Sequence, residues 1–400
     1  MRIWMINHYA LPPTTAGGTR HYYFAKQLMQ RGHEVLIIAS NYDHFSQTHR
    51  QAVCDSIDNS HEVPFFWIPS PAYRGNTLAR FWNMLVFSWR LRRTKRLLSQ
   101  SPPDVIIGSS PHLFAALGAA HLARHFKCPF ILEIRDLWPD SLVELGRFTE
   151  RHPLIKVMKK IELHLYRHAA RIISLLPMAT QYLTALGVNE KDVCYLPNAI
   201  DTDLVPEFTH EKQTKFTFMY AGAHGLANDL GTLLAAAKIL EQRGLTDKIR
   251  ICLIGEGPDK PRLQGLVLQE NIQSVEFYAP LPKKEIYAFL NKADAFMMLL
   301  KKSPVFRWGI SPNKLFDYLL MSRPVVFGVE TPFNPVKTHD AGVSVSPSDP
   351  IALANAMEHL IHLPAEKLQQ MGAKGRQFVS EHHHIARLAE RLENLLRETV

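Results

Sequence analysis

Short apolar runs of about four to six residues alternate with amphipathic stretches of about ten to twenty residues along nearly the whole chain. Such apolar runs fit strands that are buried on both faces, and the amphipathic stretches fit helices that cover them. The pattern therefore predicts an α/β protein with parallel sheets. The expected strands lie near Ile3–Asn7, Glu34–Ala39, Val63–Ile68, Asp104–Ile107, Phe130–Ile134, Arg171–Ser174, Val193–Leu196, Lys215–Ala221, Ile249–Ile254, Val275–Phe277, Ala295–Leu299, Val325–Gly328 and Gly342–Val345.

A polar stretch from Pro197 to about Lys215 interrupts this alternation, and the pattern begins again after it. Because 400 residues is too long for one ordinary domain, we expect two doubly wound, Rossmann-like domains with a hinge at Pro197–Asp201. The expected domains are residues 1–198 and 199–372. Residues 373–400 form the third expected segment, a helix that packs back on the first domain.

The stretch from Gly309 to Val326, GISPNKLFDYLLMSRPVV, is the clearest candidate for a binding site. A small polar loop runs into a helix that starts at a proline, and the start of a helix offers unpaired N–H groups and a positive dipole end to phosphate. Lys314 supplies a cation, and Asp317 supplies a carboxylate that could hold ribose hydroxyls. These features predict a nucleotide site. Its expected members are Ser311, Asn313, Lys314, Leu315 and Asp317.

Three further loops that follow strands carry glycines, and some carry cations. Glycine lets backbone approach a ligand closely, and the carboxyl ends of parallel strands share one edge of a sheet. Glycine turns are nevertheless common in any α/β protein, a solvated Lys260 is an equally simple interpretation, and no complete G-x-G-x-x-G is present. The residues we assign to the same ligand are Gly17, Gly18, Arg20, Gly222, Gly255, Gly257, Lys260 and Arg262.

The sequence Arg135-Asp136-Leu137-Trp138-Pro139-Asp140 follows another strand of the first domain. Two carboxylates, a guanidinium and an indole are costly to bury at a strand end unless they bind something. We therefore predict a substrate site there. A structural pair of Arg135 with a neighbouring aspartate is the alternative interpretation.

Histidine and cysteine are placed in ways that argue against a metal site. His382-His383-His384 falls in a helical segment and reads as an exposed helix face. The pairs His121/His125 and His164/His168 lack a third ligand nearby in the sequence. Asp201-Thr202-Asp203 resembles a motif that binds a metal and a nucleotide, but it lies in a polar turn. The four cysteines are far apart in the sequence, as expected for reduced thiols in a cytosol. We expect neither a metal nor a cofactor.

The chain is basic, with a net charge of +9 and an isoelectric point near 9.3, which implies an acidic partner. We find no nucleic-acid-binding module, so a phosphorylated substrate or an anionic membrane is favoured. Residues 78–100 predict an aromatic and basic helix that anchors on anionic lipid, or else a core helix with a solvated basic end. No apolar run is long enough to span a membrane. The residues expected to meet the membrane are Trp82, Trp89, Arg92, Arg93 and Arg96.

Taken together, these motifs resemble glycosyltransferase family 4, and in particular its bacterial O-antigen and capsule branch, which includes N-acetyl-fucosamine transferases. The resemblance covers essentially the whole chain. It depends on the sequences Gly17–Arg20, Arg135–Asp140, Leu196–Asp201, Tyr220–Gly222, Ile254–Pro258 and Ser311–Tyr318.

The resemblance implies a GT-B fold, with the acceptor held by the first domain and the nucleotide-sugar donor by the second, across an interdomain cleft. It implies metal-independent transfer with retention from a UDP-sugar, with an N-acetylated hexosamine or deoxyhexosamine as the sugar. The implied acceptor is a polyprenyl-diphosphate-linked saccharide on the cytoplasmic face of the inner membrane. In this interpretation Asp317 binds the ribose, and Lys314 faces the diphosphate. The residues expected near the reacting groups are Asp136, His224 and Arg135, and those expected at the acceptor are Trp138 and Asp140.

Two departures from the family pattern are visible. Gly309 occupies the position of the first glutamate of a Glu-x7-Glu pattern, and Asp317 stands for the second. Ala223-His224-Gly225 replaces the family's arginine and lysine after the first strand of the second domain, so Lys260, Arg262 or Arg20 would supply the charge. A nucleotide-sugar 2-epimerase of the same architecture and a non-catalytic, membrane-associated nucleotide-sugar-binding protein are the alternative functions.

Overall fold

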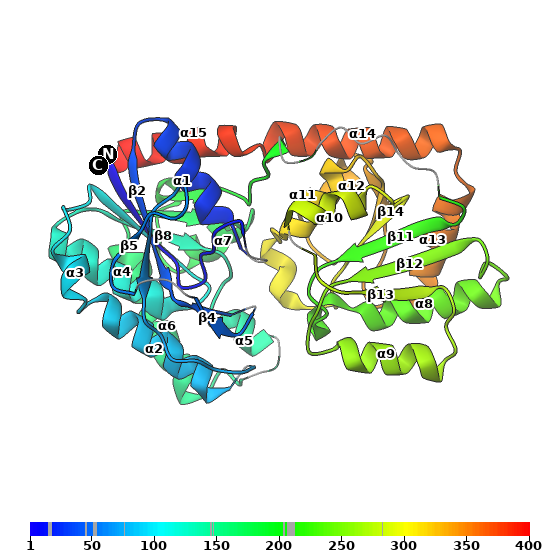
Figure 1. The fold of residues 1–400 in the computed structure, drawn as a ribbon, viewed down its shortest axis with the longest axis horizontal. Coiled ribbons are helices and arrows are strands. Elements are labelled where there is room, and N and C mark those ends of the chain that lie inside the picture. Colours follow the sequence, from blue (N-terminus) through cyan, green and yellow to red (C-terminus); the bar gives the residue numbers. More distant parts are fainter. Residues whose placement is uncertain are drawn as a thin grey trace. The chain divides into compact units, whose positions relative to one another are not determined.

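The computed structural model describes residues 1–14, 18–44, 46–50, 54–75, 77–144, 146, 148–202, 205, 213–281 and 283–400. These residues form two compact units, each built on a parallel sheet (Figure 1). The first unit comprises Met1–Ala199, Trp308–Ile310 and Ile385–Val400. The second comprises Ile200–Arg307 and Ser311–His384.

The first unit contains an eight-stranded sheet in the order β10-β9-β8-β7-β1-β2-β6-β5, in which only the β5–β6 pair is antiparallel. Its strands are β1 (Arg2–Ile6), β2 (Glu34–Ser40), β5 (Ile57–Asp58), β6 (Phe65–Ile68), β7 (Val105–Ser109), β8 (Phe130–Ile134), β9 (Arg171–Ser174) and β10 (Val193–Tyr195), and β3 (Tyr42–Asp43) and β4 (Thr48–His49) form a separate hairpin. Its helices are α1 (Arg20–Gln30), α2 (Leu78–Leu91), α3 (Lys95–Leu98), α4 (Leu113–Phe126), α5 (Asp140–Glu144), α6 (Pro153–His168), α7 (Ala179–Ala185) and α15 (Ile385–Thr399).

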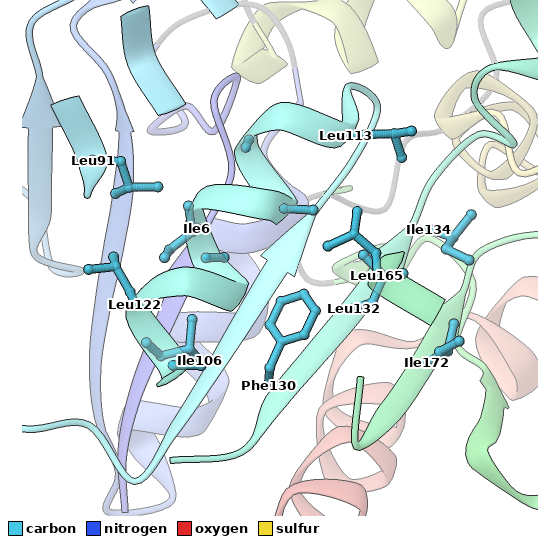
Figure 2. Close-up of a cluster of buried hydrophobic side chains, with 14 of the residues drawn as sticks. Ile6, Leu91, Ile106, Leu113, Leu122, Phe130, Leu132, Ile134, Leu165 and Ile172 are labelled. Carbon is cyan, nitrogen blue, oxygen red and sulfur yellow. The ribbon is translucent and has the colours of Figure 1, made fainter. Parts of the chain in front are cut away.

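Successive strand residues of this sheet enter two different cores, because side chains alternate between the faces of a strand. Trp4 and Ile6 of β1 belong to the core beneath α4 and α6, part of which is shown in Figure 2. Ile3 and Met5 belong to the core beneath α1 and α15. Burial on both faces explains why these strands are apolar throughout.

The second unit contains a six-stranded, fully parallel sheet in the order β13-β12-β11-β14-β15-β16. Its strands are β11 (Phe216–Ala221), β12 (Ile249–Ile254), β13 (Val275–Tyr278), β14 (Ala295–Leu299), β15 (Val325–Gly328) and β16 (Gly342–Ser344). Its helices are α8 (Leu230–Gln242), α9 (Lys260–Gln269), α10 (Lys283–Leu290), α11 (Asn313–Leu320), α12 (Pro335–Thr338), α13 (Pro350–His362) and α14 (Ala365–His382).

Each sheet has a point where the strand order reverses. In the first sheet the chain moves from β1 to β2 and later returns to place β7 on the other side of β1, and in the second β14 returns beside β11. Loops diverge at such a point, so ligands of doubly wound sheets bind outside the carboxyl ends of these strands. The loops after β1, β7, β11 and β14 are therefore the places to look for a site.

Two sequence predictions about helices were wrong. The expected single helix over residues 78–100 is divided into α2 and α3, because the N–H groups of Arg93 and Thr94 both turn back to the Arg90 carbonyl. The histidine tract is not an exposed helix face. The α14 helix ends at His382, and His383 is buried with its ring 3.8 Å from that of Phe316.

Among the described residues, no helix has both the length and the apolar character of a membrane span.

Candidate functional site

Lys314 lies in the first turn of α11, beside the carboxyl end of β11, and it is held by two neutral groups. Its Nζ donates to Asn228 Oδ1 at 2.6 Å and to Tyr220 Oη at 2.9 Å, and it lies 4.4 Å from the centre of the Tyr220 ring. The Tyr220 hydroxyl donates in turn to the Ala223 carbonyl, which fixes its lone pairs toward the lysine. Burial lowers the pKa of Lys314 to about 7. This cation is oriented by its partners but not neutralised by them.

The α11 helix is fixed to β11, and its start carries no side-chain cap. The Tyr318 hydroxyl accepts from the Ala221 N–H at 2.8 Å and donates to the Ala221 carbonyl at 2.9 Å. Pro312 occupies the N-cap position without a capping hydrogen bond, so N–H groups of the first turn remain available for an anion. One turn further, Asp317 Oδ1 accepts from the buried Tyr287 hydroxyl at 2.7 Å while the residue stays partly exposed. An ammonium, a helix start and a carboxylate thus lie along one helix.

The other residues predicted in this loop differ in what they can contribute. Asn313 is exposed and Ser311 is partly exposed. The Leu315 side chain is fully buried in the core, and its N–H donates to the Pro312 carbonyl, so the structure does not support the ligand contact that we expected for it.

The glycines of the two neighbouring loops allow backbone to pack against backbone. A Cβ atom on Gly255 would lie 2.0 Å from the Gly222 carbonyl oxygen, and one on Gly257 would lie 2.3 Å from the His224 oxygen. A Cβ on Gly222 would be 3.5 Å from Cδ of Lys314. Gly255 and Gly257 therefore hold the loops after β11 and β12 together, and Gly222 leaves space for the lysine.

His224 is fully buried between these loops. Its N–H donates to the Glu256 carbonyl at 2.8 Å, and its carbonyl accepts from Asp259. Neither ring nitrogen has a hydrogen-bond partner among the described residues. Burial and the nearby Lys260 lower the pKa of His224 to about 4. This neutral, enclosed imidazole does not fit the role near the reacting groups that we expected for it.

Lys260 and Arg262 are occupied by their own loop. Lys260 Nζ donates to the Gly255 carbonyl at 2.9 Å and to Glu256 Oε1 at 2.5 Å. Arg262 makes two bonds with Asp259, at 2.6 and 2.8 Å. Both charges are balanced by carboxylates, so Lys314 is the better-placed cation for a diphosphate, and the assignment of Lys260 and Arg262 stays a prediction.

Arg20 of the first unit is likewise committed to the protein. It is buried, and its Nε donates to Glu133 Oε2 at 2.9 Å, while its other nitrogens donate to the carbonyls of Leu196 and Pro197. Burial alone would raise the pKa of Glu133, but Arg20 and His21 outweigh it and hold that pKa well below its usual value. Arg20 therefore does not serve as the phosphate cation that we predicted.

Arg135 and Asp136, in contrast, offer unoccupied charges at the carboxyl end of β8. Within the described part of the chain, neither side chain makes a hydrogen bond or an ion pair, and Asp136 is exposed. The Arg135 guanidinium lies 3.7 Å from the position of a Cβ on Gly18, so that glycine leaves space for the cation. Gly17, the other predicted glycine, lies outside the described residues.

Trp138 and Asp140 are used for packing. Asp140 pairs with Lys159 at 2.5 Å and accepts from the Tyr182 hydroxyl at 2.8 Å. The same hydroxyl lies 2.9 Å from the buried Glu162, so these contacts tie α5 to α6 and α7. Trp138 packs against the first core. These contacts give both residues a structural role, and their assignment to the acceptor stays a prediction.

Gly309 stands where a glutamate was expected, and the structure gives the reason. Its φ is +96°, and a Cβ would lie 2.5 Å from the Pro177 ring. The neighbouring Trp308 is fixed too, because its carbonyl accepts from the Met178 N–H at 3.0 Å. A glutamate at this position would be strained in its backbone and would collide with Pro177.

The sequence did not predict that Tyr220 and Asn228 hold Lys314, or that Tyr287 holds Asp317. Each acts through a predicted residue, Lys314 or Asp317, and the first two lie far from that residue in the chain. The one signal in the sequence was the absence of the family's arginine and lysine after β11. It indicated that another residue must supply the positive charge for the phosphate.

Known families match both halves of the chain. Residues 15–199 match the family described as "Glycosyl transferase 4-like domain", and residues 201–378 match "Glycosyl transferases group 1". One relative is the "Putative colanic acid biosynthesis glycosyl transferase WcaI" of Escherichia coli (strain K12). It is 23% identical over 245 residues, which cover 57% of this chain and 58% of that protein. The match thus spans little more than half the length of this relative.

Several solved structures share the fold of the whole chain. Sucrose-phosphate synthase from Thermosynechococcus elongatus has a TM-score of 0.77 at 16% identity, covering 99% of this chain and 98% of that one. Anabaena HepE in complex with UDP-glucose has a TM-score of 0.69 at 12% identity, with 100% of both chains covered. The lipopolysaccharide glycosyltransferase WaaG has a TM-score of 0.70 at 11% identity, covering 99% of each. The fold is GT-B, and each half of the chain matches a glycosyltransferase family, over residues 15–199 and 201–378.

Proposed function

We propose that the chain transfers a sugar, with retention and without a metal, from a UDP-sugar to a polyprenyl-diphosphate-linked saccharide during synthesis of a cell-surface polysaccharide. An N-acetylated hexosamine or deoxyhexosamine is the proposed sugar. The observation that carries the nucleotide part is Lys314, an ammonium oriented by two neutral groups beside a helix start and Asp317. The UDP-glucose complex of HepE supports UDP as the nucleotide.

The proposed reaction breaks the bond between the anomeric carbon and the donor phosphate, and the electron pair stays on the departing UDP. Preorganised positive groups stabilise such developing charge more than they stabilise the bound donor. Lys314 and the first N–H groups of α11 are suited to this task, and Asp317 is suited to the ribose hydroxyls. The acceptor oxygen bonds to the anomeric carbon, and its proton passes to the departing phosphate. This follows the family resemblance, so no side-chain base is assigned.

Arg135 and Asp136 are the proposed acceptor residues, because their charged side chains lie at a strand end and make no hydrogen bond or ion pair with the described residues. A guanidinium is suited to the diphosphate of a lipid-linked saccharide, and a carboxylate is suited to a sugar hydroxyl. Peripheral binding to the cytoplasmic face of the inner membrane through α2 would bring the protein to this acceptor. The exposed Leu78, Trp82 and Trp89 support that contact.

A donor panel tests the proposal. Purified protein is incubated with UDP-, GDP- and dTDP-sugars and a polyprenyl-diphosphate-linked saccharide, and nucleotide release and the anomeric configuration of the product are measured. We expect UDP release that depends on the acceptor, and loss of about 10²–10³-fold in kcat in Lys314→Met. Lys374→Met, which removes a surface cation of the same unit, is the control. Absence of turnover with every donor, or epimer formation without acceptor, would overturn the proposal.

A further inference from the structure

A groove with a volume of about 410 Å³ lies in the first unit, apart from Arg135 and Asp136. Its wall residues come from the end of α2, from α4, from the start of β8 and from the end of α6. The groove is at the amino end of β8, whereas Arg135 and Asp136 follow its carboxyl end. Five strand residues separate the two, or roughly 16 Å. The groove is therefore a different place from the candidate substrate site.

The polar side chains that line this groove are mostly cationic or histidine. They are Arg92, His121, Arg124, His164 and His168, and no aspartate or glutamate is among the lining residues, all of which the structure describes. The Arg124 guanidinium has no hydrogen bond or ion pair with the described residues. The rings of His164 and His168 lie with their centres 4.1 Å apart. His168 Nδ1 donates to the His164 carbonyl at 2.8 Å, so an anion in the groove would meet two guanidinium groups and the imidazoles of His121 and His164.

The charged surroundings of these histidines are cationic as well. Burial and then Arg92 and Arg124 lower the pKa of His121, and burial, His168 and Arg124 lower the pKa of His164. These effects favour the neutral imidazole of His121 and of His164. The imidazoles can donate hydrogen bonds to an anion in that form.

Helix ends explain only part of this arrangement. Cations near the last turn of a helix are commonly stabilising, which accounts for Arg124 on α4 and His168 on α6. Each could satisfy its own helix while pointing into solvent. Helix stability does not explain why side chains from three helices converge on one groove whose other lining residues are mostly apolar.

The groove continues an exposed apolar stripe of α2. Leu78, Trp82 and Trp89 recur at helical spacing and are 88%, 59% and 48% exposed, and Arg92 follows one turn later at the groove. Arg93 lies over the Trp89 ring, 5.0 Å from its centre. A surface that combines aromatic side chains with adjacent cations matches the interface of an anionic bilayer.

We propose that this groove binds the phosphate group of an anionic lipid in the bilayer that α2 contacts. The inference rests on the proposed membrane contact and adds a headgroup site made by α4 and α6. Because neither Arg124 nor His164 lies on α2, the groove can be altered without changing the aromatic stripe.

Vesicle binding tests the groove against a matched control. The groove variant is Arg124→Gln with His164→Gln, and the control is His125→Gln with Arg167→Gln, which alters the same helices and residue types outside the groove. On phosphatidylcholine vesicles containing phosphatidylglycerol, we expect the groove variant to partition at least about fivefold more weakly than wild type. We expect the control to stay within about twofold of wild type. Melting temperatures establish that both variants are folded.

Two further arms separate the possible failures. If the groove variant binds like the control while Trp82→Ser with Trp89→Ser loses vesicle binding, the headgroup site is refuted and the α2 contact stands. If wild type does not bind anionic vesicles at all, both proposals fail. Titration with glycerol phosphate identifies a soluble ligand instead: loss of that binding in the groove variant, with vesicle binding unchanged, would overturn the lipid assignment.

Discussion

At the scale of single residues, the candidate donor site depends on which groups contact each lysine and arginine side chain. Lys314 is bound by a phenol and an amide, whereas Lys260, Arg262 and Arg20 are paired with carboxylates. A carboxylate partner neutralises the positive charge that would attract a phosphate, whereas a neutral partner leaves that charge in place. The cations therefore differ in function although they look alike in the sequence.

The pKa of Lys314 predicts how UDP binding depends on pH. Above about pH 7 the empty site holds a neutral amine, which must take up a proton to bind phosphate. The affinity for UDP should then fall by up to about tenfold for each further pH unit, until the pKa of the bound state is reached. Calorimetric titration measures this. Lys314→Met should bind more weakly with a flat profile between about pH 7 and pH 9, and a steep profile in that variant would contradict the assignment.

Glu133 is a second residue with a measurable effect. Glu133→Gln leaves the buried Arg20 without its carboxylate, so we expect the free energy of unfolding to fall by about 3–5 kcal/mol in urea titrations. The pKa of Glu133 is lower in the folded than in the unfolded chain, so its contribution is present above about pH 4.3 and is lost as the pH falls through its folded value. A double variant, Arg20→Met with Glu133→Leu, should recover part of the loss.

At the scale of elements, the sequence predicted the strands almost to the residue. Each strand of the two main sheets beyond β5 coincides within about two residues with an apolar run, because burial on both faces leaves an unambiguous signal. The short strands β3, β4 and β5 were missed, since two residues carry no period. The break between α2 and α3 was missed as well, because basic residues of good helix propensity continue through it.

The Trp308–Ile310 segment offers a prediction about local geometry. Gly309→Ala should lower the free energy of unfolding by about 1–3 kcal/mol, because it combines a positive φ with a contact to Pro177. Gly265→Ala is the control, since its Cβ would meet nothing within 4 Å and it lies inside α9. Equal stabilities of the two variants would exclude this explanation for the missing glutamate.

The basic segment that follows α2 predicts how strongly the protein binds anionic lipid. Replacing Arg92, Arg93 and Arg96 by glutamate should release the protein from anionic vesicles, because like charges then face the lipid. Co-sedimentation measures the bound fraction. Lys367→Glu, Lys374→Glu and Arg376→Glu on α14 is a control of equal charge change in the second unit, and equal retention of both variants would argue against the contact.

At the scale of the whole molecule, the first unit is assembled from three separate parts of the chain. The α15 helix returns to it and packs Leu388, Leu392 and Leu396 into the core that also contains α1. The sequence predicted two Rossmann-like halves and a helix over residues 373–400 that packs back on the first. In the structure α14 extends to His382 within the second unit, and the part that belongs to the first unit begins at Ile385. The structural roles of Arg20, His224 and Asp140 could not be predicted, because the sequence does not show which residues contact a given side chain in the folded protein.

This assembly predicts a separation of stability from binding. Leu388→Ala and Leu396→Ala should each lower the free energy of unfolding of the first unit by about 2–5 kcal/mol, because both side chains are fully enclosed. The affinity for UDP should remain within about twofold, since Lys314 and Asp317 belong to the second unit. A matching loss of UDP affinity in folded protein would show that the units are not independent in this way.

The return of α15 also sets an order of events during biosynthesis. The helix that covers one face of the first sheet is translated only after residues 200–384 have been made. At about 5–20 residues per second, the ribosome needs roughly 10–40 s for that stretch. Throughout this interval α1 covers that face of the nascent first unit without α15, and we expect the apolar surface left exposed to bind chaperones until the last helix emerges.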